Sequence, residues 1–204
     1  PSTGLLEFGE DAGGGLESPN GPLRIGVTHA DGNADGAYIY PDSFISSNNF
    51  DFIQIGVSSG AGTAMASVVL GSNVSGPQAD NSSLEIGVSH GPGDAIASMQ
   101  GGEVDDFSTV DIGVAHSTGN ANADLDIGFN LEGTNTNALQ GPVNIGVSNG
   151  IGSATGDVAL LLSVFGSVTT ENFSELNLGI ANSTGSANGR LLNSNGIDIP
   201  SINV

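Results

Sequence analysis

Apolar and polar residues follow the same order in six segments of the chain, which align without gaps around a glycine. The six segments are LRIGVTHADGNADGAY from Leu23, IQIGVSSGAGTAMASV from Ile53, LEIGVSHGPGDAIASM from Leu84, VDIGVAHSTGNANADL from Val110, VNIGVSNGIGSATGDV from Val143 and LNLGIANSTGSANGRL from Leu176. The aligned glycines, which we call position 0, are Gly26, Gly56, Gly87, Gly113, Gly146 and Gly179. They lie 26 to 33 residues apart, so the sequence predicts a repeat protein.

Several positions of this repeat are restricted to one kind of residue. Positions −3, −1 and +1 are always Leu, Ile or Val, position +10 is Ala or Gly, and position +12 is large and apolar. Position +6 is always glycine: Gly32, Gly62, Gly93, Gly119, Gly152 and Gly185. Position +8 is always alanine: Ala34, Ala64, Ala95, Ala121, Ala154 and Ala187.

Apolar residues at alternate positions predict β-strands, because successive side chains of a strand point to opposite faces. We expect the first strand of each repeat to send three side chains to one side, for example Leu84, Ile86 and Val88. A glycine-rich turn follows, and the second strand then turns small residues such as Ala95 and Ala97 toward the same interior. The predicted fold is therefore all-β, a repetitive β-solenoid of stacked β-arches with six repeats of about 30 residues.

The remaining segments suggest how the chain is organised around these repeats. We expect a Gly/Pro-rich N-terminal segment at 1–22, one β-repeat domain at 23–196, and a strand-like tail at 197–204. A weaker L-x-I-G motif recurs about 15 residues after position 0, as in Leu125–Phe129, and Leu6–Gly9 resembles a degenerate copy of this motif. This second period suggests that each repeat consists of two coils of about 15 residues.

The composition limits the partners of the protein. The chain has 22 acidic residues and only two basic ones, and its net charge of −20 repels phosphate backbones and anionic membrane surfaces, so we expect neither as a partner. No apolar run approaches the roughly 18 residues that span a bilayer. There is no cysteine, and the Gly-, Ser- and Asn-rich, weakly charged composition is typical of secreted surface material. We expect divalent cations to be natural partners and the protein to be extracellular.

Three copies of the repeat match G-x-S-x-G, the pattern of a hydrolase nucleophile elbow, at Ser58, Ser89 and Ser148. A nucleophile elbow is a single strand-to-helix turn, whereas here no helix is expected and other copies replace the serine by Ala115 or Ala181. We interpret the motif as repeat packing and predict that the protein is not an enzyme. No catalytic or cofactor-binding residues are assigned.

The three histidines share position +3 of the repeat. His29, His90 and His116 alternate there with Ser59, Asn149 and Asn182, which predicts a polar ladder near a turn. Imidazoles beside carboxylates would also suit a transition metal, for which only the second and third histidines are neighbours. Four acidic residues lie close together in the sequence, and we interpret them as a solvated loop: Glu103, Asp105, Asp106 and Asp111.

One segment resembles the start of a calcium-binding loop. Asp31–Gly36 reads D-x-N-x-D-G, and Asp42 occupies the twelfth position of the loop. The candidate calcium ligands are Asp31, Asn33, Asp35 and Asp42. The alternative is an ordinary turn rich in Asp and Asn.

The columnar I-G-V-[ST]…G-x-A-x-[AG] pattern of residues 23–195 resembles the repeats of secreted functional amyloids of the curli and Fap type. Its rhythm is also similar to that of the β-roll heads of trimeric autotransporter adhesins. The first resemblance implies a self-assembling, cross-β fibre subunit of a biofilm matrix. The second implies a folded binding module.

Two functions follow as hypotheses. The first is a structural protein that polymerises with copies of itself, head to tail or edge to edge, into an extracellular fibre, sheath or biofilm-matrix filament. Its leader or tail would add a strand to the neighbouring subunit. The alternative is a secreted adhesin or binding module, a capped β-solenoid with calcium-braced loops. An enzyme with its site in the variable loops is a third and weaker hypothesis.

Overall fold

The computed structural model describes residues 1–7, 21–40, 50–70, 73–75, 83–100, 103–105, 108–127, 142–160, 175–193 and 202–203. These residues form β-strands and turns and contain no helix. Fourteen of the strands form two seven-stranded sheets. Sheet A contains, in spatial order, β1 (Ser2–Glu7), β3 (Ala34–Tyr40), β5 (Ala64–Leu70), β8 (Ala95–Gln100), β11 (Ala121–Ile127), β13 (Ala154–Leu160) and β15 (Ala187–Asn193).

Sheet B is built from the first strands of the repeats. Its order is β2 (Gly21–Ile25), β4 (Phe50–Ile55), β7 (Ser83–Ile86), β10 (Thr109–Ile112), β12 (Pro142–Ile145), β14 (Glu175–Leu178) and β16 (Ile202–Asn203). The short strands β6 (Asn73–Ser75) and β9 (Glu103–Asp105) pair with each other. All of these pairings are parallel.

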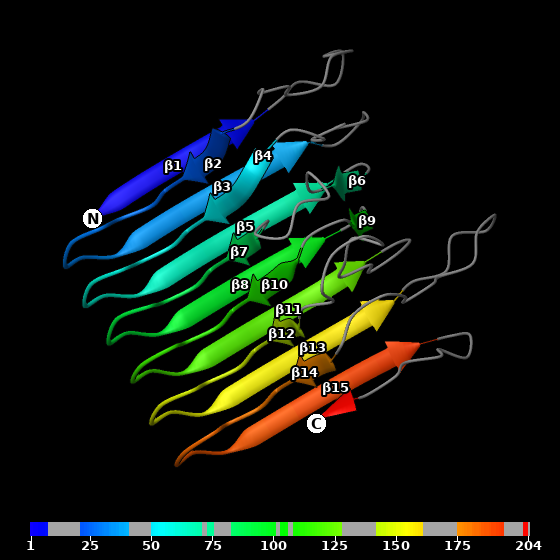
Figure 1. The fold of residues 1–204 in the computed structure, drawn as a ribbon. Helices are drawn as coiled ribbons and strands as arrows, with labels where there is room; N and C mark the ends of the chain where they lie inside the picture. The colour runs from blue at the N-terminus through cyan, green and yellow to red at the C-terminus, as the bar shows by residue number, and fades with distance from the viewer. Residues whose placement is uncertain are drawn as a thin grey trace.

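Each repeat therefore adds one layer to the stack, with its first strand in sheet B and its second strand in sheet A. Figure 1 shows the layers following one another in chain order, with the two termini at opposite ends. Equivalent positions are in register: Leu84 pairs with Val110, and Ala95 with Ala121. The predicted all-β solenoid of six repeats is confirmed.

The core lies between the two sheets. Positions −3 and −1 of the first strand pack against positions +10 and +12 of the second, so that Leu84 and Ile86 belong to one cluster with Ala97 and Met99. All four side chains are at most 2% exposed. Large side chains facing small ones explain why a chain without Trp and with few aromatic residues still forms a close-packed interior.

The arches between the strands stack through their backbones. The Gly62 N–H donates to the carbonyl of Pro92 in the next layer, 3.0 Å away. A Cβ on Gly62 would collide with the carbonyl oxygen of Gly32 in the preceding layer. Position +6 is therefore glycine because no side chain fits between stacked arches.

The interpretation of each repeat as two coils of about 15 residues is wrong. Leu125 and Ile127 lie in β11, the strand that also contains Ala121, so the weaker motif is the end of the second strand. Leu6 is likewise in register with Tyr38 at position +12. The chain closes one layer per repeat, because the first and second strands belong to different sheets.

The segments outside the repeats contain a strand each. β1 lies within the Gly/Pro-rich N-terminal segment and pairs with β3, and β16 lies within the tail and pairs with β14. Residues 41–49 and 161–174, which separate successive repeats, lie outside the described residues.

Candidate functional site: two polar ladders on sheet B

The glycine at position 0 redirects the chain at the end of every sheet B strand. All six of these glycines have φ between 60° and 62°, a conformation that L-residues rarely adopt. After this kink the strand alternation no longer holds, and the position +1 residues Val57, Val88, Val114 and Val147 form a cluster separate from the core. The prediction that Val88 shares the side of Leu84 and Ile86 is therefore wrong.

Polar side chains follow position −2 along the face of sheet B that points away from the core. This first ladder consists of Arg24, Gln54, Glu85, Asp111, Asn144 and Asn177. From one end, Arg24 Nε donates to Gln54 Oε1 at 3.0 Å, and Gln54 Nε2 donates to Glu85 Oε2 at 2.8 Å. From the other end, Asn177 Nδ2 donates to Asn144 Oδ1 at 2.9 Å, and Asn144 Nδ2 donates to Asp111 Oδ1 at 2.7 Å. The donors of both ends converge on two adjacent carboxylates.

The second ladder follows position +3, just beyond the kink, and confirms the predicted polar ladder. Its members are His29, Ser59, His90, His116, Asn149 and Asn182. The rings of His90 and His116 stack, with centroids 4.9 Å apart and planes inclined by 5°. Asn149 Nδ2 lies 3.2 Å from His116 Nδ1, and Asn182 Nδ2 donates to Asn149 Oδ1 at 2.7 Å.

In the middle of the stack the two ladders join. His90 Nε2 lies 3.4 Å from Glu85 Oε2, and His116 Nε2 lies 3.5 Å from Asp111 Oδ2. Because Glu85 and Asp111 are in register on neighbouring strands, two carboxylates and two imidazoles form one cluster, which we call the His–carboxylate cluster.

The electrostatics of this cluster favour a charged pair. Burial alone would raise the pKa of Glu85, but hydrogen bonds to His90 and Gln54 and the charges of the two histidines outweigh it, so the pKa is lowered. The hydrogen bond to Glu85 raises the pKa of His90 against the opposing effect of burial. Within the described part of the chain, no group of three or more His, Cys, Asp or Glu side chains is arranged to hold a metal ion.

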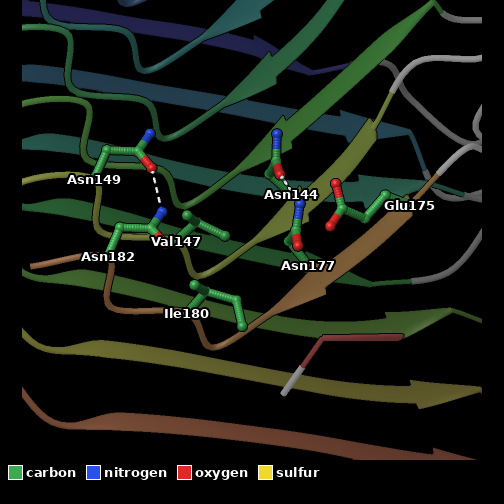
Figure 2. Close-up of a pocket in the computed structure, with 7 residues that line it drawn as sticks. All are labelled: Asn144, Val147, Asn149, Glu175, Asn177, Ile180 and Asn182. Carbon is green, nitrogen blue, oxygen red and sulfur yellow. Dashed lines mark hydrogen bonds between the residues drawn. The ribbon is translucent and has the colours of Figure 1, made fainter. Parts of the chain in front are cut away.

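Toward the C-terminal end of the stack the ladders consist of amides and line a half-open cavity of about 390 Å³. Figure 2 shows the Asn144–Asn177 pair on one side and the Asn149–Asn182 pair on the other, with Val147 and Ile180 between them. Glu175 also lines the cavity. The cavity therefore has an apolar floor and walls whose amides already bond to one another.

The serines of the G-x-S-x-G matches lie inside the arches. Ser58, Ser89 and Ser148 are 0% exposed. Ser89 Oγ donates to the carbonyl of Gly91 at 3.1 Å, and Ser148 Oγ donates to the carbonyl of Gly119 at 3.0 Å. These hydroxyls are inaccessible to a substrate and serve to satisfy backbone carbonyls.

Two of the candidate calcium ligands contact the next layer of the stack. Asp31 Oδ1 accepts the N–H of Ala61 at 2.9 Å, and Asn33 Oδ1 accepts the N–H of Thr63 at 3.1 Å. Asp35 lies on β3, and Asp42 lies outside the described residues. Asp31 and Asn33 therefore have a structural role without calcium, because each accepts a backbone N–H group of the next layer. Calcium binding stays a prediction.

The acidic group at 103–111 is not one solvated loop. Asp111 lies in β10, is 7% exposed and belongs to the first ladder, whereas Glu103 and Asp105 lie in β9; Asp106 lies outside the described residues. Glu85 and the first ladder as a whole were not predicted from the sequence, although the signal was present: position −2 is polar in all six copies.

Comparisons with protein-family models, with curated proteins and with solved structures found no match. No helix of the described residues is long and apolar enough to cross a membrane.

Proposed function

We propose that this protein is a self-assembling structural subunit of an extracellular fibre, sheath or biofilm-matrix filament with cross-β stacking. The observation that carries the proposal is the parallel, in-register stacking of the repeats into two sheets, in which equivalent residues of successive layers lie beside one another. Every layer of such a stack presents the same backbone groups to the next, and unpaired N–H and C=O groups of a sheet favour the addition of another chain.

The carboxylates suggest how assembly is controlled. Glu85 faces Asp111, and Asp124 faces Asp157, on strands that are in register. Strands in a sheet lie about 4.8 Å apart, so these carboxylates repel when both are charged. Copies with a net charge of −20 repel one another, so we expect acid, which protonates carboxylates, and divalent cations, which bind them, to promote assembly.

Electron microscopy of the purified 204-residue chain, with divalent cations and with EDTA, tests the proposal. We expect long, uniform filaments at high protein concentration, favoured by divalent cations or mildly acidic pH. Discrete particles under all of these conditions would contradict the proposal and favour a monomeric binding module.

A further inference from the structure

The two polar ladders flank a groove on the face of sheet B that points away from the core. Positions −2 and +3 of the repeats form its walls, and position +1 lies between them (Figure 2). In the third and fourth repeats a histidine reaches across the groove to a carboxylate: His90 Nε2 lies 3.4 Å from Glu85 Oε2, and His116 Nε2 lies 3.5 Å from Asp111 Oδ2. These two pairs join the walls of the groove.

The fifth and sixth repeats carry asparagine at both positions, and there the groove is open because asparagine is shorter than histidine. The amides bond along the stack: Asn177 Nδ2 donates to Asn144 Oδ1, and Asn182 Nδ2 donates to Asn149 Oδ1. Figure 2 shows the two asparagine pairs on opposite sides of the groove, with the position +1 residues between them. The result is the half-open cavity of about 390 Å³, whose lining comes from two complete repeats.

The amides of the fifth repeat are held in place from both sides. Asn144 Nδ2 donates to Asp111 Oδ1 at 2.7 Å, Asn149 Nδ2 lies 3.2 Å from His116 Nδ1, and the oxygens of both asparagines accept the amides of the sixth repeat. A primary amide has two N–H groups and two carbonyl lone pairs, so the ladders leave one of each on both residues for a ligand. Because these side chains are already ordered, a ligand that binds them does not have to immobilise them.

The lining of the cavity selects against charged and against wholly apolar ligands. Among the residues that line it, Glu175 is the only ionisable one. Its carboxylate and the net charge of −20 repel phosphates, sulfates and sugar acids. A wholly apolar ligand would bury the amide groups of the walls without replacing their hydrogen bonds to water. The lining therefore favours a neutral ligand that carries polar groups.

Hydroxyl groups match the walls, and C–H groups match the floor. A hydroxyl both donates and accepts a hydrogen bond, so it can use the remaining N–H and lone pair of one amide. A sugar ring carries hydroxyls around its rim and C–H groups on its faces, and Val147 and Ile180 provide an apolar surface between the amide walls. The volume also lies within the range of about 300–1,000 Å³ that is usual for ligand sites.

We propose that this cavity binds a neutral saccharide, whose hydroxyls bond to Asn144 and Asn149 and whose C–H face lies on Val147 and Ile180. Glu175 accepts a further hydroxyl. The inference goes beyond the proposed function and does not depend on it, because one copy of the chain contains the whole site.

An NMR titration of the full, isotope-labelled chain tests the site, at a low protein concentration and with EDTA to keep the chain monomeric. The neutral probes are glucose, maltose and cellobiose, and the charged probes are glucosamine and glucuronate. We expect at least one neutral sugar to shift the side-chain amide resonances of Asn144 and Asn149 in a saturable manner. Glucosamine and glucuronate should bind no better than glucose, because the site is built for hydroxyls and not for a charge.

Two variants of the fifth repeat alter the cavity with side chains that other repeats already carry. N144D/N149H copies the pair that Asp111 and His116 form in the fourth repeat, so it should close the groove and weaken binding by about tenfold or more. N149S removes one amide from the wall, and serine already occupies this position at Ser59. This variant should weaken binding in the same direction.

The matched control makes the same replacements on the other sheet. Asn122 in β11 and Asn188 in β15 are exposed on sheet A, and N122D/N188H changes the charge of the chain as N144D/N149H does. This control should bind the neutral sugar as the unaltered chain does. Urea unfolding shows whether each variant is folded, and N149S decides the outcome if N144D/N149H is not.

Saturable binding of a neutral sugar that the cavity variants weaken and the sheet A control preserves is the expected result. No saturable shift with any of the neutral sugars, or shifts that the cavity variants leave unchanged, would overturn the inference. Tighter binding of glucosamine that Glu175→Gln abolishes would also overturn it, because the cavity would then be a site for a cation. The micrographs of filaments test the proposed function separately.

Discussion

Replacing Gly87 with alanine tests whether the kink at position 0 holds the fold together. Gly87 has φ of 60°, and a left-handed conformation costs an L-residue about 1–2 kcal/mol. A Cβ at this position would also collide with the carbonyl oxygen of Ile96 in β8, so the segment at Gly87 must move away from β8. The bonds from Gly87 N–H to Ile55 O and from Gly113 N–H to Ile86 O, both 2.8 Å, flank the displaced segment.

The expected loss of stability follows from these contacts. Losing two backbone hydrogen bonds at about 0.5–1.5 kcal/mol each, in addition to the conformational strain, gives about 2–5 kcal/mol. This is a large part of the roughly 5–15 kcal/mol that stabilises a typical domain. Urea unfolding followed by circular dichroism, under conditions that keep the chain monomeric, measures the change.

Ser89→Ala is the matched control, because it alters the same kink without a backbone clash. It removes the hydroxyl that donates to Gly91 O, and alanine already occupies this position at Ala115 and Ala181. We expect a loss of about 1 kcal/mol or less. If Gly87→Ala were as mild as this control, the reasoning that the kink requires glycine would be refuted.

Three further predictions concern packing, pH and calcium. Ala95→Leu should destabilise the monomer by about 1–3 kcal/mol and reduce assembly, because Ala95 is 0% exposed, whereas Ala187→Leu at the exposed equivalent position should leave urea unfolding nearly unchanged. Folding raises the pKa of His90, so the contribution of His90 to the free energy of unfolding is fully present below its unfolded pKa and is lost as pH rises through its folded pKa. Folding lowers the pKa of Glu85, so the contribution of Glu85 to the free energy of unfolding is lost as pH falls through its folded pKa. Unfolding measured from mildly acidic to alkaline pH should therefore show a loss of stability that His90→Asn flattens; identical profiles would contradict the pairing. Asp31→Ala should lower stability by about 1 kcal/mol through the lost bond to Ala61 N–H, and only a calcium-dependent melting temperature that this variant abolishes would establish the calcium prediction.

Much of the fold could be predicted from the repeat, because each column of the alignment becomes a column of the stack. Position +8 is alanine because Ala95 and its equivalents pack inside, and position +6 is glycine because arches such as that of Gly62 stack directly on their neighbours. The alternation rule failed at Val88, because it assumes an extended backbone and Gly87 is not extended. The local motif at Leu125 suggested a second coil, since the residue pattern alone does not reveal that Leu125 continues the strand that begins at Ala121.

The candidate site was harder to predict than the fold. The histidine ladder followed from one column, but its connection to Glu85 and Asp111 depends on the kink, which brings positions −2 and +3 together. Asp111 was assigned to a loop because it lies near other acidic residues in the sequence, although its repeat position places it in a strand.

The strand spacing along the axis of filaments of this chain tests the central claim most directly. In the proposed polymer the sheets of one copy continue into those of the next, so the strands should lie perpendicular to the filament axis with a cross-β spacing of about 4.8 Å along it. Fibre diffraction or helical reconstruction from electron micrographs measures this spacing. Filaments without the spacing of about 4.8 Å along their axis would contradict the claim that copies stack through their sheets. The absence of filaments at any pH or cation concentration would contradict the account as a whole.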